Sequence, residues 1–209
     1  MERVLIFGGN NTLGQIIARH LLTAGMKVTV FAEEENDFKI SHHMFRYIKG
    51  DVYNVHSVSQ ALAGQDAVIS VYSTSYLWKL FYLRDALQNI IRGMNERNVS
   101  RFIFFSYSDE DFPSSDGHIH NPFFKKLFGI DYSTRIKTVF EESVRKSSLN
   151  FTIDTFDLEF LKHTPRSIFL DKIKSYYFRI ADEIQKQLIM KNSWHSNVQL
   201  RFNNQMEMA

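Results

Sequence analysis

The chain has 209 residues, of which 44% are hydrophobic, 14% aromatic and 23% charged, and this is enough apolar material for a sizeable core. Its 25 basic and 23 acidic residues give a formal net charge of +2 without a basic block, which disfavours nucleic acid as the main partner. Because it has no cysteine, disulfides, thiolate zinc sites and a cysteine nucleophile are excluded, and a reducing compartment fits.

No stretch of the sequence is typical of a membrane or signal segment. The apolar run Val4 to Phe7 at the amino terminus is too short for a signal peptide, and no later run approaches the roughly 18 apolar residues of a spanning helix. We therefore expect a cytoplasmic protein, monomeric or homodimeric, that acts on a small molecule without a membrane or nucleic-acid partner.

Short apolar runs alternate with helical periods along the chain. The runs predict strands over 4–7, 27–31, 44–48, 67–71, 101–105, 151–155 and 198–202, and the periods predict helices over 13–21, 55–62, 80–94, 133–146 and 170–190. Parallel neighbours need crossover helices, so the pattern predicts an α/β fold, a Rossmann-like doubly wound parallel sheet with helices on both faces. We expect one domain over residues 1–209, with a long functional loop over 106–131.

Glycines are concentrated between the first predicted strand and the first predicted helix. Gly8, Gly9 and Gly14 lie there within seven residues, although the whole chain has only nine glycines. In a doubly wound sheet this turn lies at the carboxyl edge, where unpaired helix amides and the helix dipole favour a phosphate. Three polar residues of the turn can cap the helix: Asn10, Asn11 and Thr12. Dinucleotide binding and a plain strand-to-helix turn are both compatible with this pattern.

The segment FGGNNTLGQIIARHLLTAGMKVTVF resembles the opening of the atypical short-chain dehydrogenases, the NmrA-like and flavin-reductase-like NAD(P)-binding group. That group has a Gly-x-x-Gly-x-x-Gly turn, in which Gly8 and Gly14 match the outer glycines and Asn11 replaces the middle one. Four later stretches follow in the same order: GDVYNVHSVSQALAGQDAVISV, DALQNIIRGMNERNVSRFIFFS, KTVFEESVRKSSL and NFTI. The resemblance covers about residues 3–155 and leaves 155–209 as a divergent portion on the substrate side.

The resemblance implies a set of cofactor-binding residues. Asp51 would lie against the adenine, and the end of the fourth strand would line the ribose and phosphate path. The residues implied are Gly8, Asn10, Asn11, Thr12, Leu13, Gly14, Glu33, Asp51, Val52, Tyr72, Ser73 and Ser106. The position that usually receives the 2′-phosphate of NADP holds Ala32 and Glu33, followed by Glu34 and Glu35. Carboxylates there favour NAD over NADP, unless these glutamates only form a solvated loop.

The catalytic residues of the family are matched only in part. Short-chain dehydrogenases usually carry a serine and a tyrosine four residues before a lysine, so that the ammonium lowers the pKa of the phenol. Tyr132 and Lys137 are five residues apart, which places them about 140° apart around a helix. Ser108 is the best match to the serine, and Thr155-Phe156 replaces an Arg-Pro pair of the family. The candidate catalytic residues are therefore Ser108, Tyr132 and Lys137, without the usual Tyr-x-x-x-Lys pair.

Three functions remain open. The first is an NAD(P)H-dependent oxidoreductase that transfers hydride from a bound nicotinamide to a small planar acceptor, such as a flavin or quinone, or to a carbonyl. The second is a non-catalytic, NmrA-like dinucleotide sensor or regulator, and the third is an interaction module that binds no nucleotide. The paired histidines His42-His43 and His118 with His120 lack a third ligand at a suitable spacing, so we expect no metal site.

Overall fold

The computed structural model describes residues 2–33, 40–71, 77–106, 132–156, 166–190 and 196–200. Within these residues the strands form one parallel sheet in the order β3-β2-β1-β4-β5-β6-β7. They are β1 (Arg3–Phe7), β2 (Lys27–Ala32), β3 (Phe45–Lys49), β4 (Ala67–Ser70), β5 (Arg101–Ser106), β6 (Asn150–Phe156) and β7 (Ser196–Leu200). The order reverses between β1 and β4, which is the Rossmann topology, so the predicted doubly wound parallel fold is confirmed.

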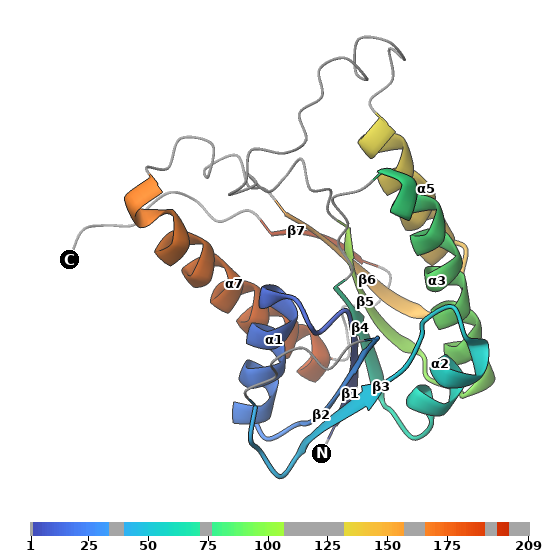
Figure 1. The fold of residues 1–209 in the computed structure, drawn as a ribbon, viewed down its shortest axis with the longest axis horizontal. Helices are drawn as coiled ribbons and strands as arrows, with labels where there is room; N and C mark the ends of the chain where they lie inside the picture. Colours follow the sequence, from blue (N-terminus) through green and yellow to red (C-terminus); the bar gives the residue numbers. More distant parts are fainter. Residues whose placement is uncertain are drawn as a thin grey trace.

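The described helices cover both faces of this sheet (Figure 1). One face carries α1 (Thr12–Thr23) and α7 (Arg166–Ile189). The opposite face carries α2 (Val55–Leu62), α3 (Leu77–Glu96) and α5 (Tyr132–Arg145). The sequence predicted these five helices in this order, and their ends differ from the predictions by a few residues at most.

Side-chain caps and left-handed residues set the ends of the helices. Asn54 accepts hydrogen bonds from the amides of His56 and Ser57 and so begins α2. At the end of α1, the amide of Met26 donates to the carbonyl of Leu21 across Gly25, whose φ is +80°. This is the Schellman pattern, in which glycine takes the left-handed position without a steric penalty.

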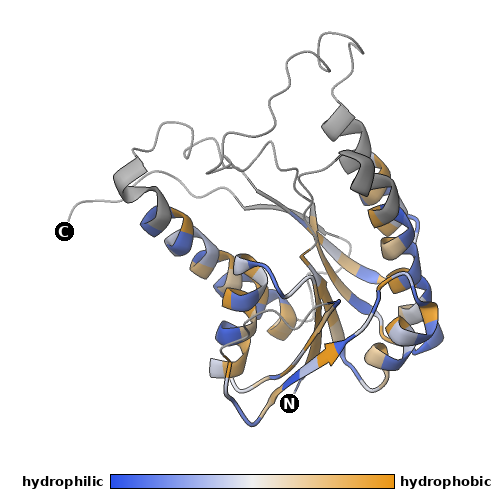
Figure 2. Cartoon of the chain, viewed as in Figure 1, coloured by the Kyte–Doolittle hydropathy of each residue, from blue (hydrophilic) through white to orange (hydrophobic). Residues whose placement is uncertain are grey.

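The core consists of two layers, one on each face of the sheet. Along β1, Val4 and Ile6 face α1 and α7, whereas Leu5 and Phe7 face the helices of the other layer, and all four are fully buried. Figure 2 shows the apolar strands between helices that are polar on their outer sides. Each such side chain contributes about 1.5–3 kcal/mol on burial, so the two layers fix the carboxyl ends of the strands relative to one another.

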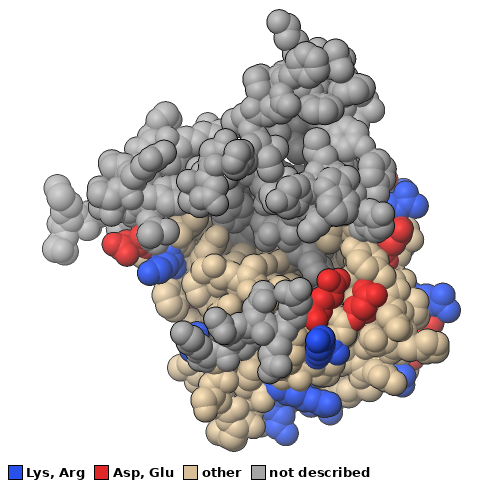
Figure 3. All heavy atoms as spheres, viewed as in Figure 1, with Lys and Arg blue, Asp and Glu red and all other residues tan. Residues whose placement is uncertain are grey.

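Acidic and basic side chains lie next to one another on the described surface, as in the ion pairs of Arg3 with Asp66 and Arg92 with Glu96. On the face shown in Figure 3, the lysines and arginines do not join into a continuous patch. Among the residues that the model describes, no helix combines the length and the apolar character needed to cross a membrane.

Candidate functional site

The candidate site lies at the carboxyl edge of the sheet, where the strand order reverses. Phe7 ends β1 and leads into the turn of residues 8–14, and Val71 follows β4 beside it. The amide of Val71 donates to the carbonyl of Phe7 at 3.0 Å, so the two chain segments are still paired at this level. In open α/β sheets this edge is where ligands bind.

Each glycine of the turn has its own structural reason: a left-handed backbone, a close side chain or a close backbone contact. Gly8 has a φ of +76°, a conformation that side chains disfavour. A Cβ atom on Gly9 would lie 2.7 Å from Cγ1 of Val30. A Cβ atom on Gly14 would lie 2.5 Å from Cα of Gly9 and 2.9 Å from the carbonyl oxygen of Gly8. The first turn of α1 therefore packs directly on the backbone of the preceding turn, and only glycine fits at residue 14.

The start of α1 has two amides that its own cap does not use. The side-chain oxygen of Asn11 accepts from the amide of Gly14 at 2.8 Å, and its carbonyl accepts from the amide of Gln15 at 3.0 Å. The amides of Thr12 and Leu13 have no acceptor within the described part of the chain. The first turn of α1 carries no acidic residue, so the positive end of the helix dipole is not neutralised there. Two adjacent donors at a helix start suit a phosphate.

Asn11 makes a second bond that leaves the turn. Its side-chain nitrogen donates to the carbonyl of Val71 at 2.7 Å. The backbone of Asn11 is extended, with φ −81° and ψ 167°, which any residue adopts. The replacement of the middle glycine is therefore compatible with the backbone of the turn, and the side chain contacts both the helix start and the end of β4.

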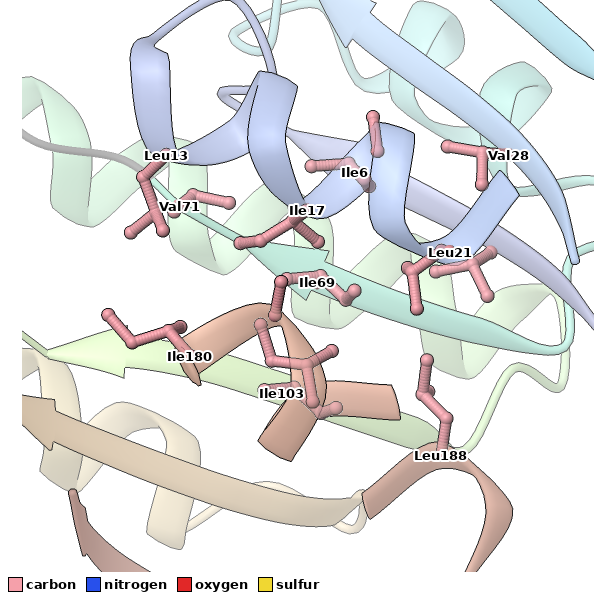
Figure 4. Close-up of a cluster of buried hydrophobic side chains, with 14 of the residues drawn as sticks. Ile6, Leu13, Ile17, Leu21, Val28, Ile69, Val71, Ile103, Ile180 and Leu188 are labelled. Atoms are coloured by element: carbon pink, nitrogen blue, oxygen red, sulfur yellow. The ribbon is translucent and has the colours of Figure 1, made fainter. Parts of the chain in front are cut away.

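Two of the residues predicted for cofactor binding have side chains that are buried in the core. Leu13 is 3% exposed, and Figure 4 shows its side chain directed toward Val71, in the layer of α1 and α7. Val52 is also 3% exposed and packs in the layer of α2 and α3. The side chains of these two residues therefore belong to the core and do not contact a ligand.

The second part of the site follows β2 and β3. The carbonyl of Ala32 accepts from the amide of Gly50 at 3.1 Å and from the hydroxyl of Tyr47 at 3.1 Å. Asp51 is exposed, and its Oδ1 accepts from the amide of Tyr53 at 2.8 Å. These bonds fix the segment after β3. Among the described residues, no hydrogen-bond donor contacts the other carboxylate oxygen, Oδ2 of Asp51. Glu33 is exposed directly after β2.

Sequence reasoning missed a residue that holds this segment. The side-chain nitrogen of Asn89 on α3 donates to the carbonyls of Val52 at 3.1 Å and Tyr53 at 3.2 Å. An asparagine in the middle of a helix is an unfavourable residue unless it has such a partner. The place of this asparagine within a predicted helix was the only feature of the sequence that could have indicated its role.

Of the three candidate catalytic residues, Tyr132 and Lys137 lie in α5, although the structure does not describe their side chains. Ser108 lies outside the described residues, as do the predicted cofactor residues Tyr72 and Ser73. Ser106 ends β5 and pairs with Thr155, but its side chain is outside the description. Tyr132 is the first residue of α5. Lys137 follows in the same helix, so their five-residue spacing leaves them about 140° apart around the axis.

A buried carboxyl that the sequence pattern does not predict lies under α7. Asp154 on β6 is fully buried, and both of its oxygens accept from the amide nitrogen of Gln187, at 3.0 and 3.3 Å. Among the described residues, no basic side chain forms an ion pair with it. Burial raises the pKa of Asp154 to about 7, against the smaller opposing effects of Gln187 and Arg101. This pair packs α7 on the sheet.

Potential metal ligands do not gather in the described ranges. The rings of His42 and His43 stack with centroids 4.7 Å apart. In the same ranges no group of three His, Cys, Asp or Glu side chains could hold a metal ion. His118 and His120 lie outside them.

Comparison with known proteins finds a family model and many solved structures of the same fold. Residues 8–154, more than half of the chain, match a family model described as NAD(P)H-binding. The match begins at the glycine turn and ends in β6, so it includes both parts of the candidate site.

Three solved structures illustrate the similarity of the fold. The enzyme WbmH of Bordetella bronchiseptica, in complex with NAD+, has a TM-score of 0.68 at 17% identity and covers 96% of this chain and 76% of its own. An oxidoreductase of Lactococcus lactis has a TM-score of 0.67 at 15% identity, and the match covers 94% of this chain and 89% of that protein. A short-chain dehydrogenase/reductase of Veillonella parvula, in complex with NADP, has a TM-score of 0.55 at 19% identity, and the match covers 74% of this chain and 69% of that protein.

A curated relative matches a short part of the chain. Ipsdienol dehydrogenase of Ips pini is 38% identical over 58 residues, which are 28% of this chain and 23% of that protein. The chain thus matches less than a quarter of the length of this relative.

Proposed function

This chain belongs to the NAD(P)H-binding family, and from that premise we propose that it is a reductase that holds a nicotinamide dinucleotide at the turn of residues 8–14. One observation carries the proposal. The amides of Thr12 and Leu13 are adjacent donors at the start of α1, without an acceptor in the described chain, on a turn too close-packed for any residue but glycine at position 14.

In this proposal each part of the site has one task. The amides of Thr12 and Leu13 bind the diphosphate, and the positive end of the α1 dipole stabilises its charge. Asp51, fixed by Tyr53, offers its remaining oxygen to the adenosine half. The bound nicotinamide supplies hydride to a small planar or carbonyl acceptor. Direct transfer to a flavin or quinone requires the protein mainly to position the reactants and exclude water, which fits the absence of a Tyr-x-x-x-Lys pair in α5.

The spacing of Tyr132 and Lys137 also supports a second candidate function. A protein that binds the dinucleotide without turning it over has no need of a general acid, so an NmrA-like sensor or regulator would keep the turn and lose the pair. Binding is common to both proposals, and turnover distinguishes them.

Thermal melting with NAD+, NADH, NADP+ and NADPH tests the proposal. A ligand at a hundred times its Kd adds about 2.7 kcal/mol to the free energy of unfolding, which corresponds to a rise in Tm of about 5–10 °C for a chain of this size. We expect this rise with at least one dinucleotide and none with nicotinamide riboside or adenosine at equal concentration. NADH oxidation against flavins and quinones then separates reductase from sensor. No rise with any of the four dinucleotides would contradict both.

Cofactor choice is tested at Glu33, the exposed carboxylate directly after β2. We propose that its carboxylate favours NAD, because it would repel the 2′-phosphate of NADP. Glu33→Arg should raise the ratio of NADP to NAD affinity about tenfold, since a 2′-phosphate then meets a cation instead of an anion. The gain should shrink at high salt.

The control for Glu33→Arg is Glu96→Arg. It makes the same change in net charge at the end of α3, at the opposite edge of the sheet, where Glu96 pairs with Arg92. An equal change of the affinity ratio in both variants would show a general charge effect and remove Glu33 from cofactor selection.

A further inference from the structure

We propose that Asn11 is a positioning residue, which holds the diphosphate turn in its binding conformation by joining the start of α1 to the end of β4. The inference rests on the proposed function and goes beyond it. Asn11 stands where the family has a glycine, and glycine has no side chain to make either of its bonds.

The two bonds of Asn11 use both ends of one amide group. Its oxygen accepts from the amide of Gly14 at 2.8 Å, and its nitrogen donates to the carbonyl of Val71 at 2.7 Å, across 60 residues of sequence. Both bonds are partly buried, so water competes with them less than at the surface. The side chain is thus held at two points and has little rotational freedom left.

These bonds connect the two chain segments at the reversal point of the sheet. The amide of Val71 donates to the carbonyl of Phe7, and the side chain of Asn11, on the other side of the glycine turn, donates to the carbonyl of Val71. The oxygen of Asn11 also takes the amide of Gly14, so that the donors left for a phosphate are those of Thr12 and Leu13. One side chain therefore decides which amides face the ligand and fixes them relative to β4.

Replacing Asn11 with serine distinguishes the effects of its two hydrogen bonds. A serine caps a helix about as well as asparagine, because its hydroxyl also accepts from the third amide. It is too short to donate to the carbonyl of Val71 while it does so. Asn11→Ser therefore keeps the start of α1 and removes the connection to β4, whereas Asn11→Ala removes both.

The test is the affinity of the two variants for NAD+, ADP and adenosine, measured by calorimetry and, for adenosine, by ligand-observed NMR. Asn11→Ser should bind NAD+ and ADP about tenfold more weakly, the cost of one lost hydrogen bond in preorganisation, and should bind adenosine as the parent does. Asn11→Ala should show the same loss with a lower Tm. The control is Gln15→Ala, which removes a 3.3 Å bond to the carbonyl of Asn10 without affecting the connection to β4. It should retain the parent affinity.

The outcomes distinguish this inference from the proposed function. If the parent binds ADP and Asn11→Ser binds it equally well, the inference is overturned and the proposed function stands. If Asn11→Ser loses ADP and adenosine affinity by the same factor, Asn11 has a general structural role and the inference is also overturned. If the parent binds neither NAD+ nor ADP, the proposed function fails, and the inference fails with it.

Discussion

Gly14→Ala is expected to lower the free energy of unfolding by about 3 kcal/mol, although alanine is the better helix former. The new Cβ would lie 2.5 Å from Cα and 3.0 Å from the carbonyl carbon of Gly9, and 2.9 Å from the oxygen of Gly8. All three are backbone atoms of a turn that cannot rotate away, so α1 would have to move off the sheet. Urea denaturation of the parent and the variant measures the loss.

The matched control is Gly93→Ala in α3, a second glycine within a helix. Its Cβ would meet Cδ1 of Leu62 at 2.7 Å and Cγ1 of Val58 at 3.3 Å, which are ends of side chains that can turn aside. Both variants gain about 1 kcal/mol of helix propensity, so the difference between them isolates the contact with the turn. Equal stability of Gly14→Ala and the parent would contradict the close packing of α1 on the turn.

Asp154→Asn is expected to make the protein more stable than the parent at pH 8 and to have little effect at pH 4. Burial raises the pKa of Asp154 from 3.8 to about 7. Between these values the folded protein retains a proton that the unfolded chain has released, so rising pH favours the unfolded chain. The cumulative cost is on the order of 4 kcal/mol above pH 7. Asparagine cannot ionise and still offers an oxygen to Gln187.

The charged groups around Asp154 act in opposite directions. Arg101 lowers the pKa of this carboxyl and Glu183 raises it, but desolvation is the largest cause. The buried Oε1 of Gln187 has no hydrogen-bond partner in the described structure. The hydroxyl of a protonated Asp154 would be a donor that the side-chain oxygen of Gln187 can accept.

Asp66→Asn is the control of opposite sign. The hydrogen bonds from Arg3 hold the pKa of Asp66 below its usual value, so its contribution to stability is present at neutral pH and is lost as the pH falls through that lowered pKa. Between pH 4 and pH 8 the stability of Asp154→Asn should therefore rise relative to the parent, whereas Asp66→Asn should stay below the parent by a nearly constant amount and approach it only below pH 4. Parallel curves for the parent and Asp154→Asn would show that Asp154 is ionised in the folded protein.

Local signals explain why the elements could be predicted from the sequence. The predicted helix 55–62 agrees with α2 because its ends depend on near neighbours, the cap Asn54 and the glycine at 64, whose φ is +74°. The strands could be predicted because β1 and β4 are buried on both faces and read as unbroken apolar runs. The glycine turn has the same local character, since Gly14 is required by residues five and six positions before it.

Contacts between distant parts of the chain could not be predicted in this way. The bond from Asn11 to Val71 and the bonds from Asn89 to the segment after β3 join residues that nothing in the sequence pairs. Asp154 is a further case. The alternation in NFTIDTF is typical of a strand with one solvated face, yet α7 covers that face and Gln187 supplies the partner of the carboxyl. Such burial depends on where α7 packs, and its Gln187 lies 33 residues after Asp154 in the sequence.

The most direct test of the account is a two-dimensional NMR titration of 15N-labelled protein with NAD+. If the diphosphate is bound at the start of α1, the amide signals of Thr12 and Leu13 should shift the most, and that of Gly14, whose donor is already used by Asn11, should shift less. Saturable binding of NAD+ that leaves the signals of Thr12 and Leu13 unchanged would contradict the account.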